Sequence, residues 1–353
     1  MTVLKLGSLF DGIGVFPLAA VHCGIEPVWA SEIEARPISI TRRHFPDMLH
    51  LGDITKISGA EIPPVDVITF GSPCQDLSQI GTRNGFAGKK SSLFYQAMRI
   101  IEEMRYATNG RYPAFCIWEN VAGAFSSNDR LDFAAMLRAF TGAEVSVPPR
   151  GWAHAGMVRG GCADTAWRLL DAQYWGEPAL VQRRKRVFVV ADFAGQRAGE
   201  VLFKPRTVLP FSAIGGPGGL PATARGGVSA AQTGRQVPIV RPFSLRRMRT
   251  MAQVGDQKGF CASFGRGGEP FPTLLASVTA PFSFWYEGEE QDGFLRVLTP
   301  LECERLMGLP ENWTKYGCKD EEISDHARYH ALGNSIALPC AEYVMAGIAE
   351  VMN

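Results

Sequence analysis

Cys74 is the residue of this chain whose setting best suits covalent chemistry. It lies in the segment GSPCQDLS at 71–78, directly after the apolar run 65–70. Parallel sheets bind ligands beyond the carboxyl ends of their strands, so a thiol on this loop is expected to open onto a cleft. A thiol attacks as the thiolate, which requires a base or a positive neighbour. We interpret Cys74 as a nucleophile rather than as a small buried hydrophobic residue.

A carboxylate and an amide follow the next predicted strand. The apolar run 113–118 is followed by Glu119 and Asn120. Neighbouring parallel strands end at one edge of a sheet, so Glu119 is expected near Cys74 as an acid, with Asn120 positioning the loop. Taken alone, Glu119 is more simply interpreted as an exposed carboxylate at a strand end.

Four cations stand in a row at 183–186, before the apolar run 187–192. Alternate residues of an extended segment share a face, so Arg184 and Arg186 are expected to point together into the cleft. Two such arginines can hold a phosphate or the carbonyl group of a base. A solvated basic run is the alternative interpretation.

The segment FDGIG at 10–14 stands where a predicted strand passes into a predicted helix. Glycines at such a turn permit close backbone approach by a ligand. Glu32, at the end of the second strand, suits ribose hydroxyls, and Asp53 suits an adenine amino group. The third glycine of a dinucleotide site is absent. The pattern therefore favours a nucleoside cofactor without a pyrophosphate, and an ordinary tight turn is the alternative.

Strands and helices alternate over the first 125 residues, which predicts parallel β-α-β units covered on both faces. The predicted strands are 3–10, 27–31, 65–70, 113–118 and 186–192. Helices are predicted to end at Gly24 and near Phe45, and to span 91–106, 131–140 and 163–170. Residues 141–161 are predicted to be irregular.

Two further helices are predicted near the C-terminus. Thr299 suits the N-cap of a helix, and Pro300 suits its first helical position. Glu302 also supports a helix that starts here. The last helix is predicted to begin near Ser335 and to run to the C-terminus.

Length and composition exclude several classes of protein. The chain has 353 residues, of which 46% are hydrophobic and 20% charged, which suits one large globular domain plus a smaller one. No apolar run approaches the roughly 20 residues of a membrane span, and the first residues lack the pattern of a signal peptide. Eight scattered cysteines without a C-x-x-C pair predict neither a disulfide framework nor a metal site. We expect a cytoplasmic protein that does not contact a membrane.

Positive charge is concentrated in one part of the chain. Residues 181–270 hold fifteen Lys and Arg against four acidic residues, whereas the net charge of the whole chain is +1. A basic block inside a neutral protein is typical of a nucleic-acid surface. A solvated basic face is the alternative.

Together these segments resemble the DNA (cytosine-5) methyltransferase family, in the family's order. The matching segments are 10–14, 71–75, 92–94, 119–121, 182–186, 296–305 and 333–335. The resemblance implies an α/β fold with a Rossmann-like S-adenosylmethionine-dependent methyltransferase sheet and helices on both faces. It also implies a smaller, irregular, β-rich target-recognition domain. The expected domains are 1–193 (catalytic), 194–294 (target recognition) and 295–353, which returns to the catalytic domain.

The resemblance also implies the residues of the site. The catalytic set is Cys74, Glu119, Asn120, Arg184 and Arg186. The residues expected to bind S-adenosylmethionine are Phe10, Asp11, Gly12, Gly14, Glu32, Ile33, Asp53, Ile54, Pro73, Leu93, Asn334 and Ser335. Those expected to bind nucleic acid are Gln75, Ser78, Arg83, Arg241, Arg246, Arg247, Arg249 and Arg266.

The implied mechanism explains these residue types. Cys74 adds to C6 of a cytosine flipped out of double-stranded DNA, Glu119 protonates or hydrogen-bonds N3, and Arg184 holds the base carbonyl. C5 then becomes nucleophilic enough to accept a methyl group. The loop 75–90 has the glycine-rich composition of a closing lid. Residues 271–277 are expected to form a framework strand of the recognition domain rather than to read bases.

Other interpretations remain open at this point. A tRNA cytosine-5 methyltransferase has the same catalytic motifs, although the long basic segment favours duplex DNA. A catalytically silent DNA-binding module would not need the thiol, and a nicotinamide-dependent oxidoreductase would not need Pro-Cys-Gln. We expect a monomer in a bacterial or phage-infected cell, with a cognate restriction endonuclease as a candidate partner.

Overall fold

The structure is a computed structural model. It describes residues 3–72, 93–204, 239–242, 271, 273–274, 282–286 and 293–353. For 239–242, 282–286 and 293–296 only the backbone is described.

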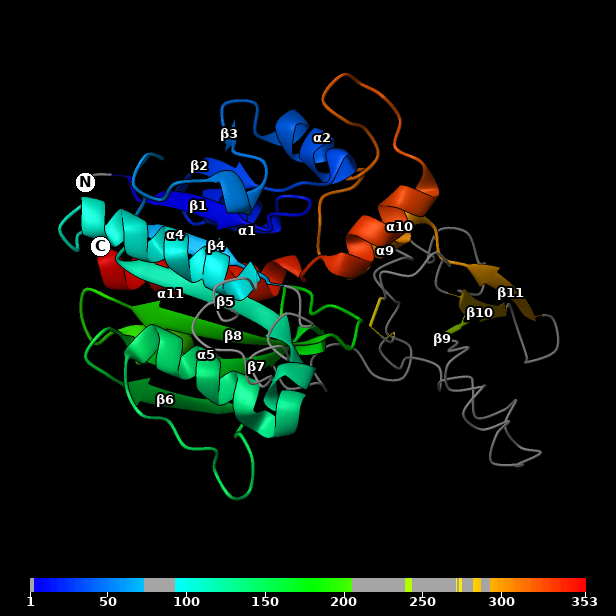
Figure 1. The fold of residues 1–353 in the computed structure, drawn as a ribbon. Helices are drawn as coiled ribbons and strands as arrows, with labels where there is room; N and C mark the ends of the chain where they lie inside the picture. The colour runs from blue at the N-terminus through cyan, green and yellow to red at the C-terminus, as the bar shows by residue number, and fades with distance from the viewer. Residues whose placement is uncertain are drawn as a thin grey trace.

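An eight-stranded mixed sheet forms the centre of the molecule, in the order β3-β2-β1-β4-β5-β8-β7-β6 (Figure 1). Its strands are β1 (Lys5–Leu9), β2 (Glu26–Ser31), β3 (Leu49–His50), β4 (Val67–Phe70), β5 (Phe115–Val121), β6 (Ala155–Arg159), β7 (Asp164–Asp171) and β8 (Lys185–Asp192). The first five strands run parallel, and β8, β7 and β6 each pair antiparallel with the preceding strand in the sheet. The predicted α/β class is confirmed.

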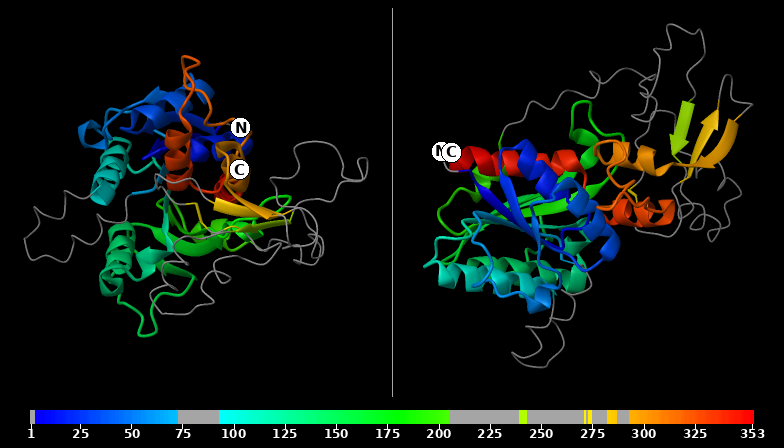
Figure 2. Two further views of the ribbon diagram at one scale, coloured as in Figure 1. Left: turned by 90° about the vertical axis from the view of Figure 1, so that its right-hand side faces the viewer. Right: turned by 90° about the horizontal axis from the view of Figure 1, so that it is seen from above.

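Helices cover both faces of this sheet (Figures 1 and 2). One face packs against α1 (Val15–His22), α6 (Ala198–Leu202) and α11 (Leu338–Met352), and the other against α4 (Leu93–Ala107) and α5 (Leu131–Thr141). Strand β8 shows how alternation builds the two cores, because Phe188 and Val190 join the first while Val187 and Val189 join the second. The helix α2 (Ala35–His44) packs beside β2 and β3, at the edge of the sheet.

The segment 163–170 is not a helix, as the sequence predicted, but strand β7. The spacing of apolar residues in this short segment (ADTAWRLL) does not distinguish a strand from a helix, and here the tertiary structure decides. Strand β7 pairs with β8 on one side and β6 on the other. Strand β6 lies within the segment predicted to be irregular and forms the edge of the sheet. Gly156 of β6 faces Trp167 so closely that an added Cβ would lie 2.3 Å from the indole ring.

The C-terminal part contains α9 (Pro300–Leu306), α10 (Asp325–Asn334) and α11. Thr299 caps α9 in a capping box with Glu302, as predicted. The last helix begins at Leu338 rather than near Ser335, because Ser335 is extended and ends α10. Short 3₁₀ turns complete the fold: η1 (Ile54–Lys56), η4 (Ala122–Phe125), η5 (Ser127–Arg130) and η6 (Ala172–Tyr174).

A second, three-stranded antiparallel sheet lies apart from the main sheet, beyond α9 and α10 (Figure 2). Its strands are β9 (Ile239–Pro242), β10 (Phe282–Tyr286) and β11 (Gly293–Val297). The strand predicted at 271–277 is not seen in its described residues: Phe271 makes one bridge with Gln182, and 273–274 are not in a strand.

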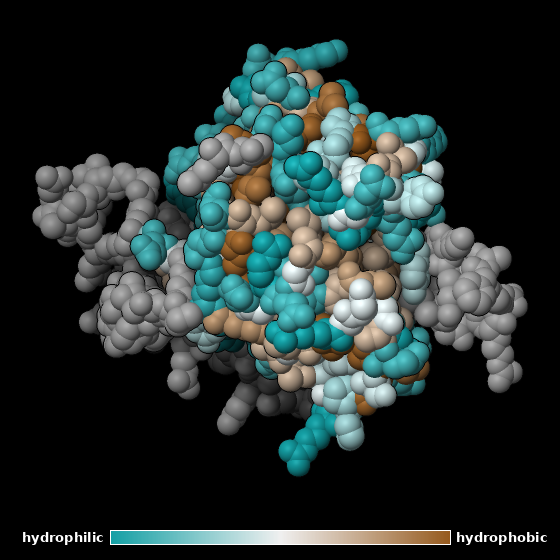
Figure 3. Space-filling view, turned by 90° about the vertical axis from the view of Figure 1, so that its left-hand side faces the viewer, coloured by the Kyte–Doolittle hydropathy of each residue, from teal (hydrophilic) through white to brown (hydrophobic). Residues whose placement is uncertain are grey.

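Both chain termini lie at the end of the molecule where the parallel strands begin. Figure 3 shows this end, on which hydrophilic residues surround a smaller central area of hydrophobic ones. Among the described helices, none is long and apolar enough to span a membrane by itself, and α10 with α11 passes that test only as a pair bent by 44°.

Candidate active site

A pocket of about 610 Å³ opens at the carboxyl ends of the parallel strands, a usual ligand position in such sheets. It contains ten of the predicted cofactor-binding residues, namely Phe10, Asp11, Gly12, Glu32, Ile33, Asp53, Ile54, Leu93, Asn334 and Ser335. Three predicted catalytic residues, Glu119, Asn120 and Arg186, line the same pocket. Its wall therefore joins the two predicted sites.

The turn between β1 and α1 forms one wall of the pocket. Phe10, Gly12 and Gly14 have positive φ angles of 54°, 60° and 79°. At Gly14 a Cβ would lie 2.6 Å from the side chain of Thr41, so the turn needs glycine for packing as well as for conformation. Gly14 itself does not line the pocket; it lets α1 begin close to α2.

Glu32 holds this turn against the end of β2. Its Oε2 accepts a hydrogen bond of 2.9 Å from the backbone N–H of Gly12, and its Oε1 accepts from the backbone of Ile33 and Glu34. These bonds orient the carboxylate at the pocket wall. Asp53 accepts hydrogen bonds from the backbone and hydroxyl of Thr55, which lower its pKa, so it stays charged.

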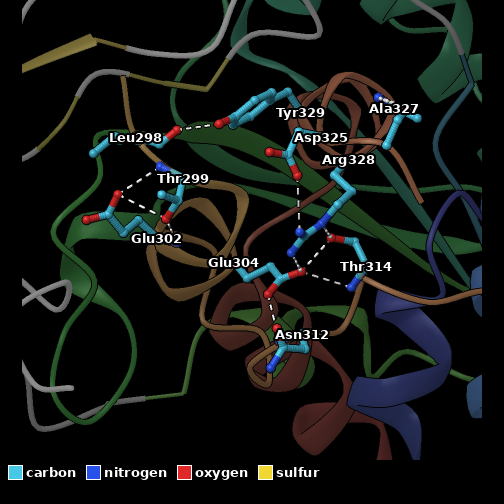
Figure 4. Close-up of polar contacts among 11 residues, drawn as sticks. Leu298, Thr299, Glu302, Glu304, Asn312, Thr314, Asp325, Ala327, Arg328 and Tyr329 are labelled. Atoms are coloured by element: carbon cyan, nitrogen blue, oxygen red, sulfur yellow. Dashed lines mark hydrogen bonds and ion pairs between the residues drawn. The ribbon is translucent and has the colours of Figure 1, made fainter. Parts of the chain in front are cut away.

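Asn334 and Ser335 reach the pocket because a buried network fixes α10 against α9 (Figure 4). The fully buried Glu304 forms an ion pair of 3.0 Å with Arg328 and accepts hydrogen bonds from the backbone and hydroxyl of Thr314. Every oxygen of this buried carboxylate has a partner, so the network is rigid.

A second contact joins the C-terminal part to the glycine turn. The indole N–H of Trp313 donates a hydrogen bond of 2.8 Å to the carbonyl oxygen of Ile13. Behind it, the ring of His44 stacks on Trp313 with a centroid separation of 3.6 Å. The turn is thereby held from α2 and from the segment between α9 and α10.

Glu119 and Arg186 form the polar pair of the pocket. Arg186 Nε lies 2.9 Å from Oε1 of Glu119, and both side chains are mostly buried. The register of the strands explains this contact. Val121 of β5 pairs with Arg186 of β8, and Glu119 lies two residues before Val121, so Glu119 is the diagonal neighbour of Arg186 on the same face of the sheet. Burial raises the pKa of Glu119, while the charges of Arg186 and Arg184 oppose that rise.

Asn120 positions the chain that leads toward Cys74. Its side-chain amide donates a hydrogen bond of 3.0 Å to the carbonyl oxygen of Ser72, and its Oδ1 accepts from the backbone of Val121. The indole of Trp118 donates to the hydroxyl of Ser72. Gly71 is needed here, because a Cβ would lie 3.1 Å from the Glu119 carboxylate.

Arg184 does not share the pocket with Arg186, contrary to the expectation from alternation. Its guanidinium is buried and donates to the backbone carbonyls of Leu274, Gly333 and Ser335. Burial lowers its pKa to about 9. The contacts place Arg184 behind the wall, where it joins three segments, so Arg186 is the better placed of the two to meet a base.

Several predicted residues lie outside the described part of the chain. They are Pro73, Cys74, Gln75, Ser78, Arg83, Arg246, Arg247, Arg249 and Arg266. Arg241 stands in β9, of which only the backbone is described.

Thr273 and Leu274 line the pocket, although the sequence predicted only a framework role for their segment. The hydroxyl of Thr273 donates to the carbonyl oxygen of Arg183, and Phe271 pairs with the backbone on either side of Gln182. Sequence patterns did not indicate this approach, because it depends on a contact between segments about ninety residues apart. Ser31, Glu34 and Ile336 were also missed, although each neighbours a predicted site residue in the chain.

The fold and the pocket define a class of protein. This mixed α/β sheet, with a pocket at its strand ends, has the fold of methyltransferases whose structures are solved. Residues 4–203 and 243–350 match the family described as C-5 cytosine-specific DNA methylase. The chain belongs to this family.

Relatives that are named as methyltransferases match nearly the whole of this chain. A protein of Escherichia phage P1, named DNA N-6-adenine-methyltransferase, is 24% identical over 463 residues and matches 98% of this chain, which spans 61% of that protein. The type II methyltransferase M1.ScrFI of Lactococcus lactis subsp. cremoris is 26% identical, over 99% of this chain and 78% of its own length. The S. pombe Dnmt2 methyltransferase shares the fold, with a TM-score of 0.59, 15% identity and 99% of both chains covered.

The methyl donor of this family is S-adenosylmethionine, and the pocket fits it. Both carboxylate oxygens of Asp11 are buried in the pocket wall without a cationic partner among the described residues. A positively charged ligand would satisfy them, and a sulfonium nucleoside carries that charge. Glu32 and Asp53 would offer acceptors to its hydroxyl and amino groups.

Proposed function

We propose that this chain methylates C5 of a cytosine in duplex DNA, within a defined base sequence. The observation that carries the proposal is the Glu119–Arg186 pair in the wall of a nucleoside-sized pocket. Membership of the C-5 cytosine-specific family supports the reaction type.

Cys74 is the nucleophile in this proposal. Its sulfur forms a bond to C6 of the flipped base while N3 takes a proton from Glu119, so the ring electrons become available at C5. S-adenosylmethionine supplies the methyl group as an electrophile. Loss of the C5 proton to a base, departure of the sulfur as thiolate and return of the N3 proton to Glu119 then restore the aromatic ring. Asn120 orients Ser72, two residues before Cys74 in the chain.

We assign to Arg186 the role of donating a hydrogen bond to the carbonyl oxygen of the base. Its guanidinium is anchored through Nε to Glu119 and through Nη1 to the carbonyl oxygen of Lys185, so the N–H groups that remain can meet a second acceptor. The same contact keeps Glu119 oriented. This role replaces the one that the sequence suggested for Arg184, whose terminal nitrogens already donate to backbone carbonyls.

DNA is the substrate implied by the family, and residues 194–294 are proposed as the part that selects its sequence. Support comes from Thr273 and Leu274, which bring this part of the chain to the pocket, and from the basic residues concentrated there. Arg241, Arg246, Arg247, Arg249 and Arg266 are proposed to contact phosphates or guanine edges. The loop that carries Gln75, Ser78 and Arg83 is proposed to close over the flipped base.

The cellular setting is proposed from the first two relatives, which come from a phage and a bacterium. We propose a monomer that acts in the cytoplasm of a bacterial or phage-infected cell. A restriction endonuclease with the same recognition sequence is its proposed partner, since the relatives include type II methyltransferases.

Two measurements test the proposed function. Bisulfite sequencing of DNA from cells that express the chain is expected to show methylcytosine within one short sequence. A duplex with 5-fluorocytosine in that sequence should then form a covalent adduct at Cys74, visible by mass spectrometry. Methylation of tRNA instead of DNA, or an adduct that persists in Cys74→Ala, would refute the proposal.

A further inference from the structure

One carboxylate of the pocket has no cationic partner in the part of the chain that the structure describes. Both Oδ atoms of Asp11 are buried, and the described groups that act on them are the Ser8 hydroxyl and the like-charged Glu32. The residue lies in the glycine turn and lines the pocket. Burying a charged carboxylate is unfavourable unless a cation pairs with it or a proton neutralises it. Asp11 is therefore expected either to bind a cation or to be protonated.

The charges around Asp11 do not supply the cation. The other charged residues that line the pocket in the described ranges are Glu32, Glu34, Asp53, Glu119 and Arg186. Arg186 is paired with Glu119, and the remaining three are acidic. Behind the turn, His44 of α2 stacks on Trp313 and contacts its carbonyl oxygen.

Burial and the charge of Glu32 raise the pKa of Asp11 to about 7, although the nearby Ser8 hydroxyl lowers it. The free protein therefore carries the acid form below neutral pH. A bound cation would favour the carboxylate and so displace the proton.

We propose that Asp11 is the counter-charge for the positively charged methyl donor, and that it releases its proton to solvent when the donor binds. The inference rests on the proposed assignment of this pocket to the cofactor. S-adenosylmethionine carries a sulfonium and an α-ammonium group, whereas the product S-adenosylhomocysteine carries only the ammonium. If the charge that Asp11 pairs with is the sulfonium, Asp11 also makes the pocket bind S-adenosylmethionine more tightly than S-adenosylhomocysteine.

Isothermal titration calorimetry of the full chain, in pairs of buffers with different ionisation enthalpies, measures this proton release. Measurements between pH 5.5 and 7.5 stay below the pKa of a free α-ammonium, about 7.7–8.0. We expect the wild-type chain to release protons on binding S-adenosylmethionine, more at pH 6 than at pH 7.5. Its affinity should fall as the pH drops below about 7, toward a limit of about tenfold per pH unit.

Asp11→Asn and Asp53→Asn form a matched pair of variants. Asp11→Asn should bind more weakly at pH 7.5, without that proton release and with an affinity that varies little with pH. Asp53→Asn also loses a pocket carboxylate but should keep the release. If S-adenosylhomocysteine causes the same release, the ammonium is the partner of Asp11, and if it causes none, the sulfonium is.

Either of those results supports the proposal. Binding of S-adenosylmethionine to the wild-type chain with no more proton release than in Asp11→Asn would overturn it and leave the proposed function intact. A wild-type chain that binds no S-adenosylmethionine at all would overturn the cofactor assignment as well.

Discussion

The guanidinium of Arg184 donates a hydrogen bond of 2.8 Å to the carbonyl oxygen of Leu274, ninety residues further along the chain. Arg184 directly precedes the strand that carries Arg186, and Leu274 lies in the pocket wall. One side chain thus ties the segment proposed to meet the base to the segment proposed to approach DNA.

Replacing Arg184 by methionine is expected to destabilise the protein by about 3–5 kcal/mol. The variant leaves the buried carbonyl oxygens of Leu274, Gly333 and Ser335 without a donor, and each unsatisfied group costs about 1–3 kcal/mol. Arg184→Lys, which keeps a donor, should lose less. Urea unfolding followed by circular dichroism measures both, and equal midpoints for wild type and Arg184→Met would contradict the prediction.

Glu119→Gln is expected to lower the turnover number by about 10²–10⁴, the usual contribution of a general acid. Burial raises the pKa of Glu119, so the wild-type carboxyl keeps its proton to a higher pH than an ordinary glutamate. Turnover by the wild type should therefore decline as the pH rises through that pKa, and the decline should be absent in the variant. A profile of turnover against pH on a defined duplex tests this, and an unchanged alkaline limb would exclude Glu119 as the acid.

Asn120→Ala is expected to slow covalent attack without weakening cofactor binding. The variant removes the hydrogen bond that orients Ser72, two residues before Cys74. Asn120→Asp serves as the control because it keeps the size and loses the donor. The rate of adduct formation with a 5-fluorocytosine duplex should fall at least tenfold in both, by the loss of about 1.4 kcal/mol of transition-state stabilisation. Unchanged rates would show that Asn120 does not position the loop.

Glu304→Ala is expected to destabilise the protein by about 3–5 kcal/mol, because it leaves the buried guanidinium of Arg328 with only the weaker ion pair to the exposed Asp325 among the described residues. The double variant Glu304→Leu with Arg328→Met removes both charges and should recover most of that loss. Thermal and urea unfolding measure both variants. If the single variant were as stable as the wild type, the network would not be what holds α10 in place.

Asp11→Asn is expected to stabilise the free protein at pH 8 by up to about 4 kcal/mol. The folded pKa of about 7 lies above the ordinary value of 3.8, so the carboxyl destabilises the fold increasingly as the pH rises between these values. The difference in stability between the variant and the wild type should vanish near pH 4. Urea unfolding at pH 4, 6 and 8 gives the comparison, and a constant difference would contradict the raised pKa.

Local patterns predicted the α/β class and most of the elements around the pocket. Apolar runs such as 65–70 and 113–118 are too short for helices, and the helix signals at Thr299 and Glu302 are local hydrogen bonds that neighbouring residues can make by themselves. The parallel strands then bring their carboxyl ends to one edge. For this reason Glu32, Asp53 and Glu119 were predicted in one pocket, and the structure places them there. Their roles, and that of Cys74, stay predictions.

The sequence by itself therefore determined which residues stand at the strand ends, because the order and length of the apolar runs specify where each strand ends. The tertiary structure alone decided the partners of those residues. Strand β7 was mistaken for a helix because its identity depends on the strands that pair with it on both sides. Arg184 and Arg186 have the same chemistry and alternate on one segment, yet one meets Glu119 and the other meets three backbone carbonyls. That difference arises from packing between segments far apart in the chain, which no local pattern records.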